Sequence, residues 1–234
     1  MRDVPITLMS GTLNKPMLDE LVSTFALSSD WVLIQQDLNL RNWDSISVVD
    51  CQSTGQNLAL DAVDLLKSNL LSNHQSTVKP FRVMVFAYSI KLARLMYELL
   101  QNDVHLKQFV VSLVMASSTK EDLKQAIINY SSEELPDYST ILVSTSILTV
   151  GVNLRNVSHV FVLGTHSIVE LIQAWSRADR AGKNGKVWLL QPTRALENAD
   201  YAAVKNNGLL NQEEINKSLE FVPEEKRRGI MSTL

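Results

Sequence analysis

The sequence predicts an α/β domain in which a parallel sheet is covered by helices on both faces. Short, continuously apolar runs recur along the chain, as expected of strands that are buried on both sides. Segments with apolar residues at helical spacing alternate with these runs, which is the order that a parallel sheet with crossover helices requires. With 234 residues and a hydrophobic fraction of 45%, the chain has enough apolar material for one core of ordinary size.

The first third of the chain shows this alternation. Residues 6–10 (ITLMS) are a short β-leaning run, and Asn14 and Pro16 mark the start of a helix. Apolar residues recur in that helix at helical spacing: Leu18, Leu21, Val22 and Phe25. Two runs, residues 31–34 and 46–49, predict buried strands, and leucines at helical spacing predict a helix over residues 57–71.

The remaining strands are more strongly apolar. They are predicted at residues 82–88, 109–116, 141–145, 159–164 and 186–191. Ser89 can cap the helix that follows the first of these, whose apolar stripe ends at Leu100. Ser118 and Glu121 have the spacing of a capping box for a helix that runs to about Tyr130. A further helix is predicted over residues 169–178.

Composition excludes several classes of protein. Cys51 is the only cysteine, so an internal disulfide and a multi-cysteine zinc site are both excluded. The histidines show no metal-ligand spacing, and we expect no metal site among them. No apolar run reaches the length of about 20 residues that spans a bilayer, and the N-terminus has no long apolar signal segment. We expect an intracellular protein, nuclear or cytoplasmic, with no membrane partner.

Two arginines three residues apart, Arg177 and Arg180, lie in the segment QAWSRADRAG at residues 173–182. On one side of a helix, such a pair presents two planar, permanently charged groups that suit a phosphate chain. An arginine supplied across an interface stabilises the charge on a transferred phosphoryl group. The alternative is a surface helix whose arginines pair with Glu170 or Asp179.

The segment TSILTVGVN at residues 145–153 directly follows a predicted strand, at the carboxyl end where parallel sheets bind ligands. Gly151 allows a tight turn there, and Asn153 offers a polar side chain to a nucleotide or to an opposite lobe. The alternative is a plain strand-to-loop turn.

Five segments in sequence order resemble the motifs of superfamily 2, RecQ-like helicases. They are PITLMSGTL (motif III), VMVFAYSIKLARLMYELL (motif IV), SSTKEDLKQAI (the helix after motif IV), and VSTSILTVGVN and QAWSRADRAGKNGK (motifs V and VI). The match covers about residues 4–192. The resemblance implies a RecA-like parallel sheet and three parts. Residues 1–27 would be the end of a first lobe (motif III) with a linking helix, residues 28–195 the second RecA-like lobe, and residues 196–234 a peripheral C-terminal extension.

The resemblance also implies roles at the ATP site. Arg177 and Arg180 match the motif VI arginines that reach the ATP phosphates across the cleft, and Gln173 matches the glutamine that links motif VI to the site. Gly151 and Asn153 match the motif V turn near the nucleotide.

A second set of matches implies contacts to nucleic acid. Ser89 in motif IV and Thr145 in motif V match residues beside the nucleic-acid backbone. Ser10 and Thr12 match the motif III pair that couples the ATP state to strand contacts. The expected partners are single-stranded or partly duplex nucleic acid and a first RecA-like lobe in cis. The family resemblance favours DNA, although the residues themselves do not distinguish DNA from RNA.

The departures from these motifs bear on activity. Thr149, Ser176 and Asp179 stand where RecQ-like motifs usually have glycines, and no cysteine follows motif VI to form the zinc module common there. The sequence contains no G-x-x-x-x-G-K-[ST] phosphate loop and no D-E-x-H box. ATP and Mg²⁺ would therefore need a first lobe, and the chain alone should not hydrolyse ATP. We interpret the sequence as part of a longer protein or as a natural truncation.

These observations leave three hypotheses. The first is the C-terminal lobe of an ATP-dependent helicase, which the retained Gln173, Arg177 and Arg180 favour. The second is a non-catalytic, helicase-like scaffold or nucleic-acid-binding module, which the replaced glycines favour. The third is an unrelated doubly wound nucleotide-binding domain, which the lack of a glycine-rich fingerprint disfavours.

Overall fold

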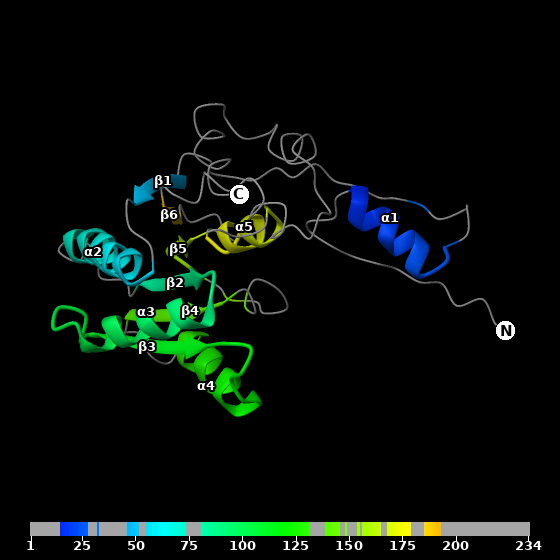
Figure 1. Cartoon of the computed structure of the whole chain (residues 1–234). Helices are drawn as coiled ribbons and strands as arrows, with labels where there is room; N and C mark the ends of the chain where they lie inside the picture. Colours follow the sequence, from blue (N-terminus) through cyan, green and yellow to red (C-terminus); the bar gives the residue numbers. More distant parts are fainter. Residues whose placement is uncertain are drawn as a thin grey trace.

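The computed structural model describes residues 15–27, 32, 46–51, 55–73, 81–131, 139–145, 148, 154, 156–164, 168–178 and 185–192. Strands and helices alternate along most of this part of the chain (Figure 1). The strands are β1 (Ile46–Cys51), β2 (Arg82–Ala87), β3 (Phe109–Val114), β4 (Ser139–Ser144), β5 (His159–Leu163) and β6 (Lys186–Pro192). The helices are α1 (Lys15–Thr24), α2 (Gln56–Asn73), α3 (Ile90–Asn102), α4 (Lys120–Ser131) and α5 (Ile168–Trp175).

The six strands form one sheet in the order β1-β6-β5-β2-β4-β3. All five pairings are parallel. The strands predicted near residues 82–88 and 141–145 lie inside the sheet, since β2 pairs with β5 and β4, and β4 pairs with β2 and β3. The predicted α/β fold is confirmed, and it is the RecA-like arrangement.

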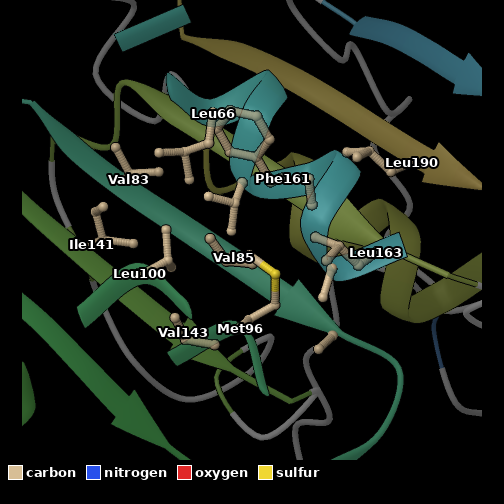
Figure 2. Close-up of a cluster of buried hydrophobic side chains, with 14 of the residues drawn as sticks. Leu66, Val83, Val85, Met96, Leu100, Ile141, Val143, Phe161, Leu163 and Leu190 are labelled. Carbon is tan, nitrogen blue, oxygen red and sulfur yellow. The ribbon is translucent and has the colours of Figure 1, made fainter. Parts of the chain in front are cut away.

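Helices cover both faces of the sheet because each interior strand sends alternate side chains to opposite sides. In β2, Met84 and Phe86 belong to a buried cluster with residues of α4 and α5 (the α4/α5 cluster). Val83 and Val85 belong to a second cluster with residues of α2 and α3 (the α2/α3 cluster). Figure 2 shows this second cluster, where Leu66 of α2 and Met96 of α3 lie over the sheet residues.

Helix α3 begins where the sequence predicts. Ser89 has an extended backbone (φ −142°, ψ 154°), and its Oγ accepts a hydrogen bond from the backbone N of Leu92 at 3.2 Å. This bond satisfies one of the free N–H groups of the first turn. The buried side of the helix is its apolar stripe, which contains Leu92, Met96 and Leu100.

Helix α4 has a capping box, but one residue later than predicted. The Thr119 hydroxyl accepts a hydrogen bond from Asp122 N (3.1 Å), and the Asp122 carboxylate accepts one from Thr119 N (3.3 Å). Ser118 instead accepts a hydrogen bond from Met115 N at 3.0 Å, in the turn before the helix. The prediction of a box between Ser118 and Glu121 was wrong because two overlapping segments, S-T-K-E and T-K-E-D, both offer a hydroxyl and a carboxylate at suitable spacing.

Three further differences concern boundaries. Val32, the described residue of the predicted strand at 31–34, lies in no strand and is 80% exposed, so that prediction is wrong at this position. Short apolar runs are ambiguous because periodicity alone does not identify them as strands. Helix α2 continues through Asn73, and α5 ends at Trp175 rather than near residue 178. The predictions for residues 1–14 and for the extension at 196–234 lie outside the described residues.

Candidate functional site

The carboxyl edge of the sheet carries two of the predicted site residues. All strands run in parallel, so their carboxyl ends meet at one edge. Ser89 lies two residues after β2, and Thr145 directly follows β4. These two strands pair, with Phe86 opposite Ser144. The fold therefore brings Ser89 and Thr145 to the ends of adjacent strands.

Both residues offer a hydroxyl group at this edge. The Ser89 Oγ caps α3 through a lone pair, and this role does not consume its O–H donor. Thr145 is half-buried, and its carbonyl accepts a hydrogen bond from the Ser144 hydroxyl at 2.8 Å. Hydroxyl donors at a helix N-terminus suit phosphate oxygens, which receive a large share of protein contacts to nucleic acid.

Tyr88 and Gly164 lie at the same edge, and sequence reasoning did not single them out. The backbone N of Tyr88 donates to the Leu163 carbonyl at 3.2 Å, and Gly164 N donates to the Leu190 carbonyl at 2.8 Å. These bonds extend the parallel ladder beyond the strand ends. The signal in the sequence was the glycine that closes the run HVFVLG, and its φ of +78° is the conformation that favours glycine.

The motif V segment is anchored by two leucines. Leu148 is 1% exposed and Leu154 is 0% exposed, and both belong to the α4/α5 cluster. The same cluster holds Trp175, at the end of the helix that carries motif VI. The two segments that the sequence links to the nucleotide thus pack against one hydrophobic cluster. Gly151 and Asn153, which lie between the leucines, fall outside the described part of the chain.

Helix α5 carries Gln173 and ends in a tight turn. Gln173 is half-buried, and its carbonyl accepts a hydrogen bond from the Ser176 hydroxyl at 2.9 Å. Arg177 N then donates to the Ala174 carbonyl (3.1 Å), an i→i−3 bond typical of a 3₁₀ turn. Ser176, which replaces a glycine of the family motif, therefore bonds a carbonyl in the last turn of the helix.

Arg177 is buried, which corrects the expectation that it is exposed on a helix face. Its side chain is 1% exposed and is the largest fully buried side chain among the described residues. The reason is local: the chain leaves the helix after Trp175, so Arg177 lies in the turn at 176–178 and not on the exposed side of α5. Arg180, like Ser10 and Thr12, belongs to a segment that the structure does not describe.

The available donors suit phosphate groups better than a metal ion. Serine and threonine hydroxyls and a side-chain amide are donors that bind phosphate oxygens. Within the described ranges there is no group of three or more His, Cys, Asp or Glu residues that could hold a metal ion. The same part of the chain contains no helix both long and apolar enough to cross a bilayer.

Comparison with known proteins identifies the domain. The family described as "Helicase conserved C-terminal domain" matches residues 61–185, more than half of the chain. The ATP-dependent RNA helicase DBP6 of Candida glabrata is 24% identical over 101 residues. That match includes 43% of this chain and 16% of the relative, so the chain corresponds to a small part of that protein.

Solved structures show the same fold. Domain 2 of the DEAD-box helicase Mss116p, bound to an RNA duplex, superposes with a TM-score of 0.54 at 17% identity, over 81% of this chain and 76% of that one. Saccharomyces cerevisiae Dbp5, bound to RNA and ADP BeF3, superposes with a TM-score of 0.58 at 15% identity, over 78% of this chain and 43% of that one. These structural similarities show the RecA-like fold. The family match over more than half of its length shows that the chain belongs to the helicase conserved C-terminal domain family.

Proposed function

We propose that this chain is the second lobe of an ATP-dependent nucleic-acid helicase, working against a first RecA-like lobe in cis. One observation carries the proposal: Leu148 of motif V and Leu154, which follows it, belong to the same hydrophobic cluster as the buried residues of the helix that carries motif VI. Such an arrangement suits a lobe that must present several groups to one ligand, because small displacements of positioned groups cost catalysis.

The ATP site of this proposal lies between two lobes. The first lobe would hold ATP and Mg²⁺, since the present chain has no phosphate loop and no acidic box. When bound, Mg²⁺–ATP supplies the phosphoryl group that is transferred to water. From this lobe, Arg180 would supply a guanidinium to the phosphates, and Gln173 and the segment containing Arg177 would hold that arginine in place. Gly151 and Asn153 would form the turn beside the nucleotide.

The nucleic-acid site of this proposal is the carboxyl edge of the sheet, where Ser89 and Thr145 end adjacent strands. Their hydroxyls would donate to backbone phosphates, which are the same for every base sequence. Ser10 and Thr12 would couple these contacts to the ATP state. The RecQ-like motifs favour DNA as the substrate. RNA is the second candidate, because the relatives named above are an RNA helicase and helicases bound to RNA.

A Ser89→Asp variant tests the strand contact in a protein that carries both lobes. Aspartate is as good an N-cap as serine, so α3 should persist, but its carboxylate would face the nucleic-acid phosphates. We expect the Kd for single-stranded DNA to rise about 10-fold at low salt, in line with a lost or repelled phosphate contact. Asn102→Asp is the control, because it adds the same charge at the exposed end of α3, which lies at the opposite edge of the sheet, and it should leave the Kd unchanged.

The same preparation distinguishes the candidate substrates. DNA and RNA of equal length and base sequence are compared for binding and for stimulation of ATP hydrolysis. If RNA stimulates ATP hydrolysis and DNA does not, the substrate is RNA and the proposal of DNA is wrong. An unchanged Kd in Ser89→Asp would show that Ser89 does not contact the strand.

A non-catalytic scaffold is the alternative function. Asp179 favours it, because a carboxylate beside ATP phosphates repels them. Ser176 does not favour the scaffold, because its hydroxyl donates a hydrogen bond to the Gln173 carbonyl and so fits in the turn. The scaffold function would be supported if the protein with both lobes binds nucleic acid but does not hydrolyse ATP.

A further inference from the structure

We propose that Ser144 is a positioning residue for the nucleic-acid contact of Thr145. Its buried hydroxyl binds the Thr145 carbonyl and so fixes the peptide of Thr145 where the chain leaves β4. This role rests on the proposed function, in which the Thr145 hydroxyl donates to the nucleic-acid backbone. The sequence motifs single out Thr145 and not the serine before it.

Ser144 lies in apolar surroundings at the end of an interior strand. Its partners in register are Phe86 of β2 and Val114 of β3, which both belong to the α4/α5 cluster. Leu142 belongs to the same cluster, and side chains alternate along a strand, so the Ser144 side chain is on the α4/α5 face. Ser144 is 0% exposed. A buried hydroxyl costs free energy unless it is hydrogen-bonded, and alanine would avoid that cost at this position. The hydroxyl bond therefore points to a role of its own.

The bond of the Ser144 hydroxyl restrains the residue that follows. The hydroxyl donates to the Thr145 carbonyl at 2.8 Å. Strand β4 ends at Ser144, so this carbonyl lies beyond the strand. Because the peptide group is planar, holding the carbonyl also fixes the plane of the peptide that follows Thr145.

A second anchor lies three residues after Thr145. Leu148 is 1% exposed and belongs to the α4/α5 cluster, so the chain turns toward that face after β4. Thr145 is thus placed between a hydrogen bond and a buried leucine, and it remains half-buried at the carboxyl edge. A hydroxyl binds a phosphate oxygen only over a narrow range of distances, about 2.5–3.0 Å between the oxygen atoms. Restraint of the Thr145 peptide therefore favours this contact.

Ser139, at the other end of β4, offers a matched control. It is 6% exposed, and its hydroxyl accepts a hydrogen bond from the backbone N of Phe81 at 3.0 Å. The strands are parallel, so Ser139 lies at the amino edge of the sheet, opposite the proposed nucleic-acid site. Ser139→Ala and Ser144→Ala each remove a buried hydroxyl bond from the same strand, but only Ser144→Ala removes a bond to Thr145.

Binding by the protein with both lobes tests the role. The Kd is measured for single-stranded DNA, or for RNA if only RNA stimulates ATP hydrolysis, well below the Tm of every variant. Ser144→Ala should raise the Kd about 5-fold, the size expected for one hydrogen bond. Ser139→Ala should leave the Kd at the parental value, although it should lower the Tm at least as much as Ser144→Ala does.

A double-mutant cycle connects the effect to Thr145. Thr145→Val removes the hydroxyl at similar volume and should raise the Kd about 10-fold. In the double variant, the Kd should equal that of Thr145→Val alone, because a positioning residue has no effect once the group that it positions is absent.

The carbonyl ¹³C resonance of Thr145 reports the bond in the absence of nucleic acid. In protein labelled at the threonine carbonyls, this resonance should shift in Ser144→Ala, because the carbonyl loses its hydrogen bond. It should stay in place in Ser139→Ala.

Four results overturn the role of Ser144. They are a parental Kd in Ser144→Ala, an equal rise of the Kd in Ser139→Ala, a multiplicative rise in the double variant, and an unchanged Thr145 carbonyl resonance in Ser144→Ala. A parental Kd in Thr145→Val contradicts the proposed contact of Thr145 with nucleic acid instead. The carbonyl resonance then still decides whether Ser144 holds the peptide.

Discussion

Gly164 lies against the ring of Tyr88, where β5 and β2 end side by side. The backbone N of Tyr88 donates to the carbonyl of Leu163, so the ring is held next to the glycine. A Cβ at position 164 would lie 2.8 Å from Cε1 and 3.0 Å from Cγ of the tyrosine, closer than carbon atoms approach in proteins. The φ of Gly164 is +78°, which any L side chain adopts with strain. Both constraints require glycine at the edge where Ser89 begins α3.

Gly164→Ala should therefore destabilise the lobe by about 3 kcal/mol, through steric overlap with Tyr88 in addition to backbone strain. Gly55→Ala is the matched control: Gly55 also has a positive φ (+57°), but no atom lies within 4 Å of a Cβ added there. It should cost about 1 kcal/mol. Urea unfolding measures both values. Equal costs at the two positions would show that Tyr88 does not restrict residue 164.

The stability of the lobe should depend on pH through His159. The His159 ring is stacked on Trp188 and contacts Phe81 edge-on, with both centroid distances 5.4 Å. Burial, with a smaller effect of the Lys186 ammonium, lowers the pKa of His159 to about 4, from an ordinary 6.5. The unfolded chain therefore takes up a proton at a pH where the folded lobe does not. The free energy of unfolding should fall by up to about 3 kcal/mol as the pH drops from 6.5 to 4.

Two histidine variants test whether His159 causes this pH dependence of stability. His159→Gln should remove most of the decrease between pH 6.5 and 4, at the cost of a lower stability at pH 7. His105→Gln, at an exposed position, should keep the parental decrease. Chemical unfolding at several pH values gives the slopes, and a parental slope in His159→Gln would assign the effect to other groups.

Asp103 joins α2 to the end of α3. Its carboxylate accepts hydrogen bonds from Lys67 Nζ at 3.1 Å and from His105 N at 2.8 Å. Burial acts to raise the pKa of Asp103, but the bond from His105 and the charge of Lys67 outweigh it and hold the pKa below the ordinary value.

Asp103→Asn should cost about 1–2 kcal/mol of stability at pH 7, since it weakens bonds to a half-buried carboxylate. Asp64→Asn should cost much less, although Asp64 also contacts Lys67 (2.9 Å), because its side chain is 74% exposed. The Asp103 contribution is present above the unfolded pKa, so the difference between parent and Asp103→Asn should shrink as the pH falls below 4. Urea titrations at pH 7 and pH 3 measure this difference in the free energy of unfolding. Equal losses of stability in the two variants at pH 7 would show that the Asp103 carboxylate contributes no more than that of Asp64.

Tyr130→Phe should leave the lobe as stable or up to about 1 kcal/mol more stable. The Tyr130 ring is 2% exposed in the α4/α5 cluster, and its hydroxyl has no hydrogen-bond partner among the described residues. Burial raises the pKa of Tyr130, which reflects the same loss of solvation. Removing a hydroxyl that is buried without a bond removes a desolvation cost.

Tyr97→Phe provides the contrast, because the Tyr97 hydroxyl accepts a hydrogen bond from Gln101 at 2.6 Å on the surface. It should be neutral or slightly destabilising. Thermal unfolding of the two variants gives the signs, and a marked loss of stability in Tyr130→Phe would reveal a partner for the buried hydroxyl.

The sequence alone determined the fold class and most element positions, because alternation and helical spacing are local properties of the chain. The runs at β2, β4 and β5 are apolar on both sides, which only interior strands of a covered sheet require. The Ser89 cap was also predictable, since it depends on residues three positions apart. The motifs likewise indicate a helicase lobe by their order alone, because that order is a property of the linear chain.

Tertiary structure alone decided how the site residues are placed. The sequence put Arg177 and Arg180 on one exposed helix face, but α5 ends at Trp175 and Arg177 is buried. The contact of Gly164 with Tyr88 and the anchoring of motif V by Leu148 and Leu154 join residues far apart in the chain. Local patterns carry no information about such neighbours, because burial and contact depend on how the elements pack and not on the spacing of residues within one element.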